Sequence, residues 1–332
     1  MKLAILGCGA WGTALAISLG ERHSVVLWGR DAAQVETLRA TRQNQHYLPG
    51  ATIPAGVCPS ADLSAAIANV DLILAAVPTN ALRQTLRVLK TAGSHTALVW
   101  ACKGFEQASS RLPHQIVKEE LGAAASCGVL SGPSFAKEVA EGKPAALTLA
   151  STDVHFAQAA AHELHGPRLR VYSSSDVAGV ELGGALKNVI AIAVGVSDGL
   201  GLGNNARAAL ITRGLAEMKR LGVQLGGQPE TFAGLTGLGD LVLTCTGDLS
   251  RNRRVGLALA KGQPLASVLT QLGHVAEGVL TAPEVKRIAA DLNVEMPITE
   301  AVCALLAGQV SAAEAVAELM RRDPKAEHQS IS

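Results

Sequence analysis

The stretch MKLAILGCGAWGTALA, residues 1–16, decides the fold of the first half of the chain. An apolar run ends at Gly7, glycines follow with the spacing GxGxxG, and a helical pattern begins directly behind them. In a strand–turn–helix unit, Gly7 permits a tight turn, Gly9 lets the backbone approach a pyrophosphate, and Gly12 lets the helix pack closely on the sheet. The stretch therefore predicts a dinucleotide-binding turn, and a glycine-rich turn without a ligand is the alternative.

Outward from this turn, short runs rich in Val, Ile and Leu alternate with amphipathic stretches up to about residue 175, which is typical of βαβ units. We expect strands at Leu3–Leu6, Ser24–Trp28, Leu72–Ala76, Ala97–Ala101, Cys127–Leu130, Ala146–Ala150 and Leu169–Tyr172. Leu72–Ala76 is interpreted as the third strand of the unit. After Asp176 long Ala/Leu-rich helical patterns take over. The prediction is an α/β Rossmann-type domain with a mostly parallel sheet over residues 1–176, followed by an all-α domain over residues 177–332.

The end of the second expected strand bears on the choice of dinucleotide. Folds of this kind that prefer NAD place an acid there for the ribose 2′-hydroxyl, whereas an Arg accepts the 2′-phosphate of NADP. Arg30 stands where the strand ends and favours NADP(H), but Asp31 follows it directly and would favour NAD(H). Arg30 as an ordinary solvated loop residue is the third interpretation.

Composition limits the class of protein. With 48% hydrophobic and 17% charged residues, the 332-residue chain has enough apolar surface to fold. A net charge of +1 gives no global field for nucleic acid or an anionic membrane. No apolar run reaches the roughly 20 residues of a membrane span, and the apolar run before Gly7 is too short for a signal peptide. The six cysteines form no CxxC pair, which predicts a cytoplasmic protein without a metal site.

Two segments at the ends of expected strands carry polar groups that sheet packing does not require. They are Cys102–Gly104 and Ser131–Ala136. Open α/β sheets bind ligands at the carboxyl ends of their strands, so both segments are candidates for the binding site.

Lys187 interrupts a long apolar run in the helical half, from Leu182 to Ala193. An amine that is partly buried can exchange a proton near neutral pH, which makes it a candidate acid or base. A lysine that snorkels to water is an equally weighted alternative.

Two further segments of the helical half contain polar groups, Gly237–Leu241 and Asp248–Arg254. Ser250 is an expected N-cap, and a helix N-terminus next to the Arg251 guanidinium suits a phosphate. Ordinary capping beside a solvated basic face is the alternative. The basic cluster is too short and too poor in aromatic neighbours to indicate nucleic-acid binding.

With these motifs in order, the chain resembles the soluble, bacterial-type NAD(P)-dependent sn-glycerol-3-phosphate dehydrogenases from Lys2 to near Ala307. The matching motifs are Gly7–Ala14, Cys102–Gly104, Ser131–Ala136, Leu186–Val189, Gly237–Leu241, Ser250–Asn252 and Val275–Gly278. The resemblance implies an enzyme that interconverts glycerol 3-phosphate and dihydroxyacetone phosphate for glycerophospholipid synthesis. It also implies a Rossmann domain, a helical domain and a homodimer.

The resemblance also assigns roles to residues. Lys187 matches the catalytic lysine, which gives and takes the proton. The positions that match substrate contacts are Lys103, Gly132, Ser134, Lys187, Asp240, Ser250, Arg251 and Asn252. Beside the turn glycines Gly7, Gly9 and Gly12, the positions that match the cofactor site are Ala10, Trp11, Arg30, Lys103, Ala136, Arg251, Val275 and Glu277. Ala10 departs from the family, since many relatives carry Ser there, and this removes one hydroxyl near the pyrophosphate.

Two other functions remain open from the residues. A related dehydrogenase could act on a hydroxy acid, although such a substrate would not require a phosphate site at Ser250–Asn252. A dinucleotide-binding sensor without catalysis is the second, and it would have no need of a proton donor at Lys103 or Lys187.

Overall fold

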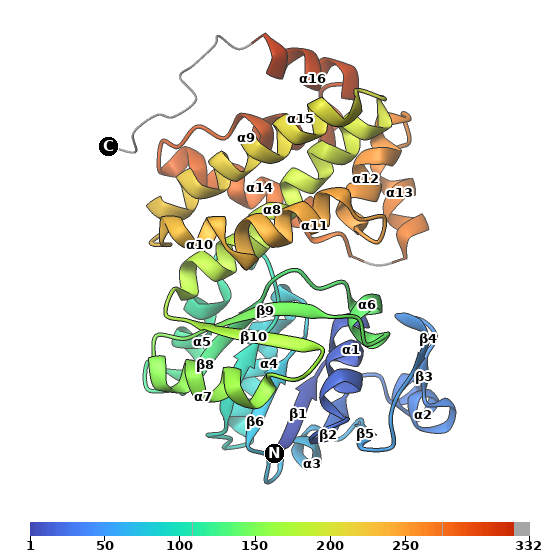
Figure 1. Cartoon of the computed structure of the whole chain (residues 1–332), viewed down its shortest axis with the longest axis vertical. Coiled ribbons are helices and arrows are strands. Elements are labelled where there is room, and N and C mark those ends of the chain that lie inside the picture. Colours follow the sequence, from blue (N-terminus) through green and yellow to red (C-terminus); the bar gives the residue numbers. More distant parts are fainter. Residues whose placement is uncertain (108, 274, 322–332) are drawn as a thin grey trace. The chain divides into compact units, whose positions relative to one another are not determined.

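The computed structural model describes residues 1–107, 109–273 and 275–321. The chain forms two compact units, which we call the sheet unit (Met1–Glu106 and Arg111–Glu181) and the helical unit (Gln107–Ser110 and Leu182–Ser332) (Figure 1). The expected domain boundary between residues 176 and 177 stays a prediction. Residues 322–332 of the predicted second domain lie outside the described residues.

The sheet unit is built on one eight-stranded sheet in the order β10-β9-β8-β7-β6-β1-β2-β5. Neighbouring strands run parallel except β8 and β9, which are antiparallel. The predicted fold class, a mostly parallel Rossmann-type sheet followed by helices, is therefore confirmed. The strands are β1 (Lys2–Leu6), β2 (Ser24–Trp28), β5 (Val57–Ser60), β6 (Leu72–Ala75), β7 (Ala97–Trp100), β8 (Cys127–Ser131), β9 (Ala145–Ala150) and β10 (Leu169–Ser174).

The edge strand β5 was not expected from the sequence. It comes third along the chain among the strands of this sheet, so the interpretation of residues 72–76 as the third strand was wrong. The strand is short and contains Pro59, which a sheet tolerates mainly at its edge. The separate antiparallel pair β3 (Gln43–Asn44) and β4 (Leu48–Thr52) was not expected from the sequence either. Because β5 and β2 lie on one side of β1 and β6 on the other, strand order reverses between β1 and β6. Ligands bind at such a reversal in open α/β sheets.

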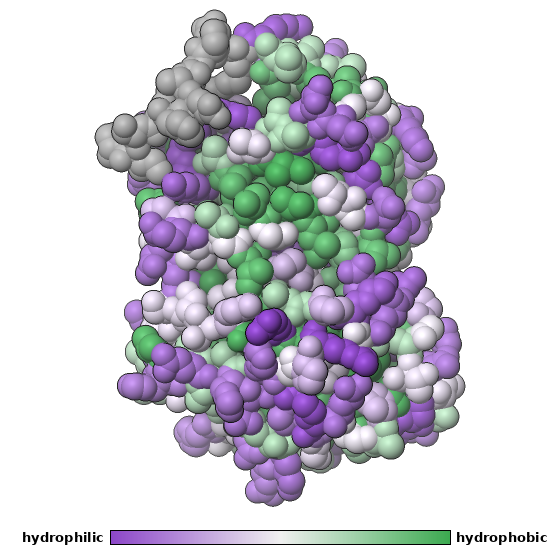
Figure 2. Space-filling model, viewed as in Figure 1, coloured by the Kyte–Doolittle hydropathy of each residue, from purple (hydrophilic) through white to green (hydrophobic). Residues whose placement is uncertain are grey.

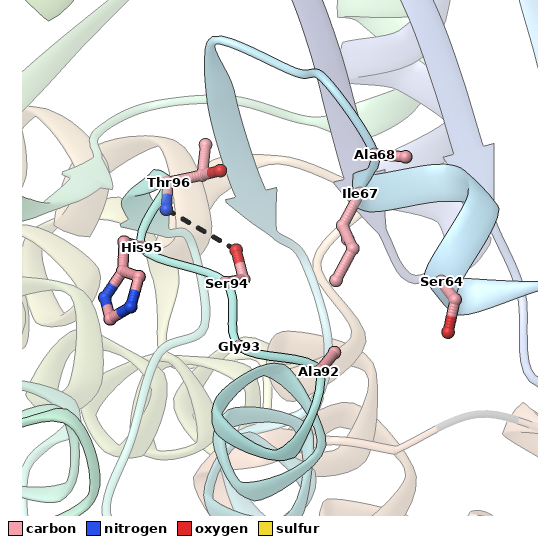
Figure 3. Close-up of a pocket in the computed structure, with 8 residues that line it drawn as sticks. All are labelled: Ser64, Ile67, Ala68, Ala92, Gly93, Ser94, His95 and Thr96. Atoms are coloured by element: carbon pink, nitrogen blue, oxygen red, sulfur yellow. Dashed lines mark hydrogen bonds between the residues drawn. The ribbon is translucent and has the colours of Figure 1, made fainter.

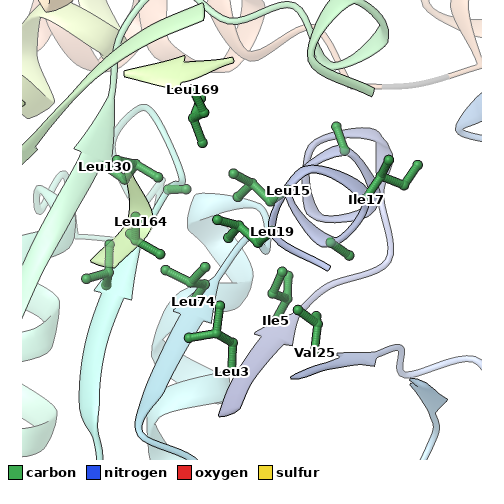
Figure 4. Packing of buried hydrophobic residues seen from close by; sticks show 14 of the residues in the cluster. Leu3, Ile5, Leu15, Ile17, Leu19, Val25, Leu74, Leu130, Leu164 and Leu169 are labelled. Atoms are coloured by element: carbon green, nitrogen blue, oxygen red, sulfur yellow. The ribbon is translucent and has the colours of Figure 1, made fainter. Parts of the chain in front are cut away.

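Both faces of the sheet are covered, which explains why β1 is apolar throughout rather than alternating. Leu3 and Ile5 point into one core with Leu15 and Leu19 of the first helix, as Figure 4 shows. Ala4 and Leu6 of β1 pack into a second core on the opposite face, with Leu82 and other side chains. Each fully buried Leu or Ile contributes about 1.5–3 kcal/mol.

The helices of the sheet unit connect successive strands. Asp31 and Asp153 cap two of them by accepting hydrogen bonds from backbone amides of the first turn. The helices are α1 (Ala10–Leu19), α2 (Ala32–Thr41), α3 (Leu63–Ile67), α4 (Thr79–Thr91), α5 (Pro113–Leu121), α6 (Ala136–Ala140) and α7 (Val154–Leu164).

The described part of the helical unit contains helices and no strand. The elements are α8 (Val177–Gly199), α9 (Gly203–Gln224), α10 (Pro229–Ala233), the π-helical turn η1 (Leu235–Gly239), α11 (Asp240–Thr246), α12 (Arg251–Ala260), α13 (Leu265–Leu272), α14 (Glu277–Asp291), α15 (Pro297–Leu306) and α16 (Ala312–Met320).

Helix α8 starts in the sheet unit and continues into the helical unit. Among the described residues it is the one helix long and apolar enough to cross a bilayer, with a mean hydropathy of 1.6 in its most apolar window. Within the protein 89% of that window is buried, as in the central helix of a helical core.

Candidate active site

The glycine turn after β1 has the geometry that its spacing predicts. Gly7 has a φ of +112°, and a Cβ there would lie 2.7 Å from the carbonyl oxygen of Ala76. A Cβ on Gly12 would lie 1.9 Å from the carbonyl oxygen of Gly7, so the start of α1 packs directly on the turn. A Cβ on Gly9 would meet no atom within 4 Å. Gly9 therefore borders open space, into which a ligand can come close to the backbone.

The N-terminus of α1 fits a pyrophosphate. Gly9 is the N-cap, no side chain of the described residues caps the helix, and its first backbone bond runs from Thr13 N to Gly9 O at 3.0 Å. By helix geometry the amides of Ala10, Trp11 and Gly12 have no intrahelical acceptor. Free amides and the helix dipole attract an anion at this position, so the residues present fit the phosphates of a dinucleotide.

Asn44, which the sequence analysis missed, holds this turn from the side. Its Nδ2 donates to the carbonyl oxygen of Cys8 at 2.8 Å and to Thr13 Oγ1 at 2.7 Å, and the residue is buried. A buried amide that bonds a loop fixes the path of the loop, because an unmade bond there costs about 1–3 kcal/mol. Its position, 36 residues after Cys8, offers no local signal.

Arg30 and Asp31 differ in how they are engaged. Asp31 Oδ1 accepts from the amides of Ala33 at 2.9 Å and Gln34 at 3.2 Å as the N-cap of α2. Arg30 is exposed at the end of β2 and makes no ion pair with any residue that the structure describes. One oxygen of the Asp31 carboxylate is therefore engaged in capping, whereas the Arg30 guanidinium is accessible from solvent and makes no ion pair with a described residue.

Three of the predicted substrate residues come together where β7 and β8 end. Lys103 Nζ donates to the carbonyl oxygen of Gly132 at 3.3 Å, and Ser134 Oγ donates to the same oxygen at 2.9 Å. Thr79 Oγ1 fixes the lysine backbone by donating to its carbonyl oxygen at 3.1 Å. Because β7 and β8 are parallel neighbours, their carboxyl ends lie side by side. The positions of these residues directly after two expected strands were therefore enough to predict that they come together.

Lys187 lies on α8 with only 6% of its surface exposed, so it does not snorkel to water. Its Nζ forms an ion pair with Asp240 Oδ1 and donates to Thr244 Oγ1 at 2.9 Å. Asp240 is 1% exposed. Thr244 Oγ1 in turn donates to the backbone carbonyl oxygen of Asp240 at 2.6 Å. The neighbouring Cys245 stays a neutral thiol, because burial raises its pKa to about 12.

A close contact of α8 with η1 explains how this pair forms. A Cβ on Gly183 would lie 2.4 Å from the carbonyl oxygen of Thr236, so the two backbones nearly touch. Lys187 is one turn further along α8, and Asp240 begins α11 directly after η1. Single π turns of this type are frequent at functional sites. Thr244 was missed by the sequence analysis, since only the fold of η1 and α11 brings it to the amine.

The first turn of α12 is tied to α8 next to Lys187. Ser250 Oγ accepts from the amide of Arg253 at 3.2 Å and caps the helix, as predicted. Asn252 is buried, its Nδ2 donates to Asn188 Oδ1 at 2.8 Å, and its Oδ1 accepts from the amide of Gly278 at 2.9 Å. These bonds leave one amide hydrogen of Asn252 for a ligand. Asn188 is a further residue that the sequence analysis did not assign.

The remaining assigned residues lie at helix starts. Glu277 begins α14, and burial raises its pKa while the positive charge of Arg251 opposes the rise. Arg251 and Glu277 therefore interact within the helical unit. Val275 is 47% exposed just before α14, and Ala136 begins α6 in the sheet unit. The structure describes no cluster of metal ligands in residues 1–107, 109–273 and 275–321.

A pocket of about 370 Å³ lies elsewhere in the sheet unit. Figure 3 shows Ile67 of α3 on one side of it, with Ser94 and His95 of the loop before β7 on the other. This loop leads into the amino end of β7, whereas the glycine turn follows the carboxyl end of β1. The pocket is therefore not part of the dinucleotide site.

The turn after β1 has the geometry that suits a dinucleotide, and an amine held out of water beside a carboxylate has the chemistry to exchange a proton. In class, the chain is an NAD(P)-dependent oxidoreductase.

Comparison with known proteins defines the class more narrowly. Residues 2–157 match the NAD-dependent glycerol-3-phosphate dehydrogenase N-terminus, and residues 176–317 match the C-terminus of the same family. The glycerol-3-phosphate dehydrogenase [NAD(P)+] of Thiobacillus denitrificans is 59% identical over 98% of this chain and 100% of its own length. The corresponding protein of Aromatoleum aromaticum is 58% identical, with the same coverage.

A crystal structure agrees. Glycerol-3-phosphate dehydrogenase from Coxiella burnetii superposes with a TM-score of 0.92 at 43% identity, covering 97% of this chain and 99% of that one. The chain belongs to the NAD-dependent glycerol-3-phosphate dehydrogenase family, and its activity is NAD(P)-dependent dehydrogenation of glycerol 3-phosphate. The predicted family and activity are confirmed.

Proposed function

We propose that the protein reversibly reduces dihydroxyacetone phosphate to sn-glycerol 3-phosphate, with Lys187 as the proton donor and acceptor. The observation that carries this proposal is the buried amine of Lys187, which is paired with the Asp240 carboxylate and hydrogen-bonded to Thr244. Burying an amine is costly, and a paired carboxylate offsets that cost. An amine held in this way is able to deliver one proton at a fixed point.

The chemistry follows from charge. The bound nicotinamide supplies the hydride in one direction and takes it in the other. Reduction places negative charge on the carbonyl oxygen of the substrate, and the Lys187 ammonium stabilises that charge and then donates the proton. In the reverse direction the neutral amine accepts the hydroxyl proton. Asp240 keeps the amine in place through their ion pair.

The phosphate of the substrate is assigned to the first turn of α12, with contacts from Ser250, Arg251 and Asn252. The bond from Asn252 to Asn188 supports this assignment, because it ties the turn to the segment that carries Lys187. A phosphate remote from the reacting carbon supplies binding energy that positions the carbonyl. Lys103, Gly132 and Ser134 are proposed as further substrate contacts.

The cofactor is assigned to the glycine turn and to positions matched by the family. These are Gly7, Gly9, Ala10, Trp11, Gly12, Arg30, Lys103, Ala136, Arg251, Val275 and Glu277. We infer a preference for NADP(H), since Arg30 is exposed at the end of β2 whereas Asp31 is engaged in capping α2. We expect the protein to use NAD(H) as well, with lower efficiency.

The test is the absorbance of the reduced nicotinamide after mixing with dihydroxyacetone phosphate, with NADPH and NADH in parallel. Oxidation of the cofactor by this ketone, faster with NADPH, is expected. No oxidation with either cofactor would contradict the proposed substrate, and a faster reaction with NADH would contradict the role of Arg30.

We also propose a cytoplasmic homodimer that supplies glycerophospholipid synthesis. All six cysteines are free, as in proteins of a reducing compartment. Figure 2 shows a mostly apolar area on the helical unit. Exposed large apolar side chains of this unit are Leu202, Leu238, Val242, Leu249, Val275, Leu292 and Met320. The apolar area in Figure 2 supports a contact between subunits, and light scattering of the purified protein tests it.

A further inference from the structure

A buried carboxylate in the helical unit is held between two arginines and has no part in the proposed chemistry. Asp198 on α8 has a side chain that is 5% exposed. Its Oδ1 accepts from Arg207 Nε of α9 at 2.8 Å, and its Oδ2 accepts from Arg253 Nε of α12 at 2.8 Å. Arg253 Nη2 lies 2.8 Å from the same Oδ2. One carboxylate thus connects three helices, and we call these three residues the Asp198 clamp.

The clamp lies next to a crossing where α8 and α12 touch through glycines. A Cβ on Gly195 would lie 2.1 Å from the carbonyl oxygen of Arg253, and a Cβ on Gly256 would lie 2.1 Å from the carbonyl oxygen of Ile192. The glycines set the separation of the two helices. They do not fix how far α12 slides or turns about its own axis, because a glycine contact offers no interlocking side chain.

The ion pair supplies what the glycines lack. Arg253 is one turn before Gly256 on α12, and Asp198 is one turn after Gly195 on α8. The Arg253 side chain is 11% exposed, and its guanidinium directs two N–H groups to one oxygen of Asp198. This geometry has a fixed direction, so it limits both the sliding and the rotation of the first turn of α12. Ser250, the N-cap of that turn, accepts its hydrogen bond from the amide of Arg253 itself.

We propose that Asp198 is a positioning residue for recognition of the substrate phosphate. Through Arg253 it orients the start of α12, so that Ser250, Arg251 and Asn252 meet the phosphate together. This inference rests on the proposed assignment of the phosphate to α12. Asp198 touches neither the substrate nor the cofactor, and it acts on substrate preference rather than on the proton transfer at Lys187.

The experiment compares two ketones at a saturating concentration of reduced cofactor. For wild type and Asp198→Asn, kcat/KM is measured with dihydroxyacetone phosphate and with unphosphorylated dihydroxyacetone, and the ratio of the two is formed. Asparagine keeps the size of the side chain but removes its charge. We expect the ratio to fall by about tenfold or more, the equivalent of one good contact to the phosphate. A carboxylate that only stabilises the fold would change both values equally and leave the ratio intact.

Asp248→Asn is the matched control. Asp248 Oδ1 accepts from Nη1 of the same Arg253 at 2.9 Å, but its side chain is 97% exposed. The substitution removes an equal charge next to the same guanidinium, and we expect the ratio to stay within about twofold because exposed pairs contribute little. An equal fall in both variants would overturn a specific role for Asp198.

Two further variants separate the possible failures. Arg253→Lys keeps the charge but loses the two-pronged contact, so the ratio should fall as in Asp198→Asn. If neither clamp variant folds, the clamp holds the fold rather than the site, and the proposal is wrong. Arg251→Met tests the phosphate assignment itself. If it leaves the ratio unchanged, the assignment to α12 fails; if it lowers the ratio while Asp198→Asn does not, only the clamp proposal fails.

Discussion

Replacing Lys187 by methionine tests the centre of the proposed chemistry. The variant keeps the length and most of the volume of the side chain, but it removes the ammonium that faces Asp240 and Thr244. Two consequences follow from the geometry, one for turnover and one for stability, and they can be measured separately.

The loss of turnover has two sources. The ammonium no longer stabilises the developing negative charge, which for a single donor costs about 10²–10³ in kcat. Proton donation by a positioned group, worth about 10²–10⁴, is lost as well. Since one group supplies both effects, the two factors overlap, and we expect kcat to fall by about 10³ or more.

The loss of stability comes from Asp240. Its carboxylate is 1% exposed, so removing the amine leaves a buried charge without its main partner. Breaking a buried pair from one side costs about 3–5 kcal/mol. The double variant Lys187→Met/Asp240→Asn removes the charge too and should recover most of that loss. It should remain as inactive as the single variant, because the proton donor is still missing.

The assay is the absorbance of NADPH with dihydroxyacetone phosphate, combined with urea unfolding of the wild type and both variants. Inactivity of a double variant that is as stable as wild type would assign the loss to chemistry rather than to folding. Turnover of Lys187→Met within about tenfold of wild type would refute the proton role. A single variant as stable as wild type would refute the account of the buried pair.

Three other predictions concern the turn, the cofactor and pH. Gly9→Ala should fold normally and raise the KM for the cofactor, since its Cβ enters the open space proposed for the cofactor. Gly12→Ala should lower the melting temperature, because its Cβ would lie 1.9 Å from the carbonyl oxygen of Gly7. Equal melting temperatures of the two variants would contradict this account. Arg30→Ala should raise the KM for NADPH by roughly tenfold to a hundredfold and leave the KM for NADH unchanged, and equal effects on both would contradict contact with the 2′-phosphate. Burial raises the pKa of Glu217 to about 7, so the folded state favours the protonated form of this side chain. The free energy of unfolding should therefore fall by about 3 kcal/mol as pH rises from about 4.5 to 7. Glu217→Gln should remove this fall in urea unfolding between pH 5 and pH 8, and an unchanged pH dependence would contradict it.

The turn after β1 and the helix starts were predictable because their causes lie within a few residues. The roles of Gly7, Gly9 and Gly12 follow from their spacing between an apolar strand and a helix. The cap at Ser250 depends on the amide of Arg253, three residues away. Each predicted strand is present in the structure, since a buried parallel strand reads as a continuous apolar run.

What the tertiary structure decided involves residues far apart in the chain. Lys187 bonds to Thr244, Asn188 to Asn252, and Asp198 to Arg253, over separations of 57, 64 and 55 residues. No local period encodes such pairs, because they depend on how helices pack rather than on how each one forms. The tertiary structure also decided that β8 pairs antiparallel with β9 and that β5 lies at the edge of the sheet. The sequence by itself determined the glycine turn, the two kinds of secondary structure and the family. Only the packing of η1, α11 and α12 on α8 decided that the Lys187 amine lies out of water next to a carboxylate, because burial and long-range pairing exist only once the helices are in contact.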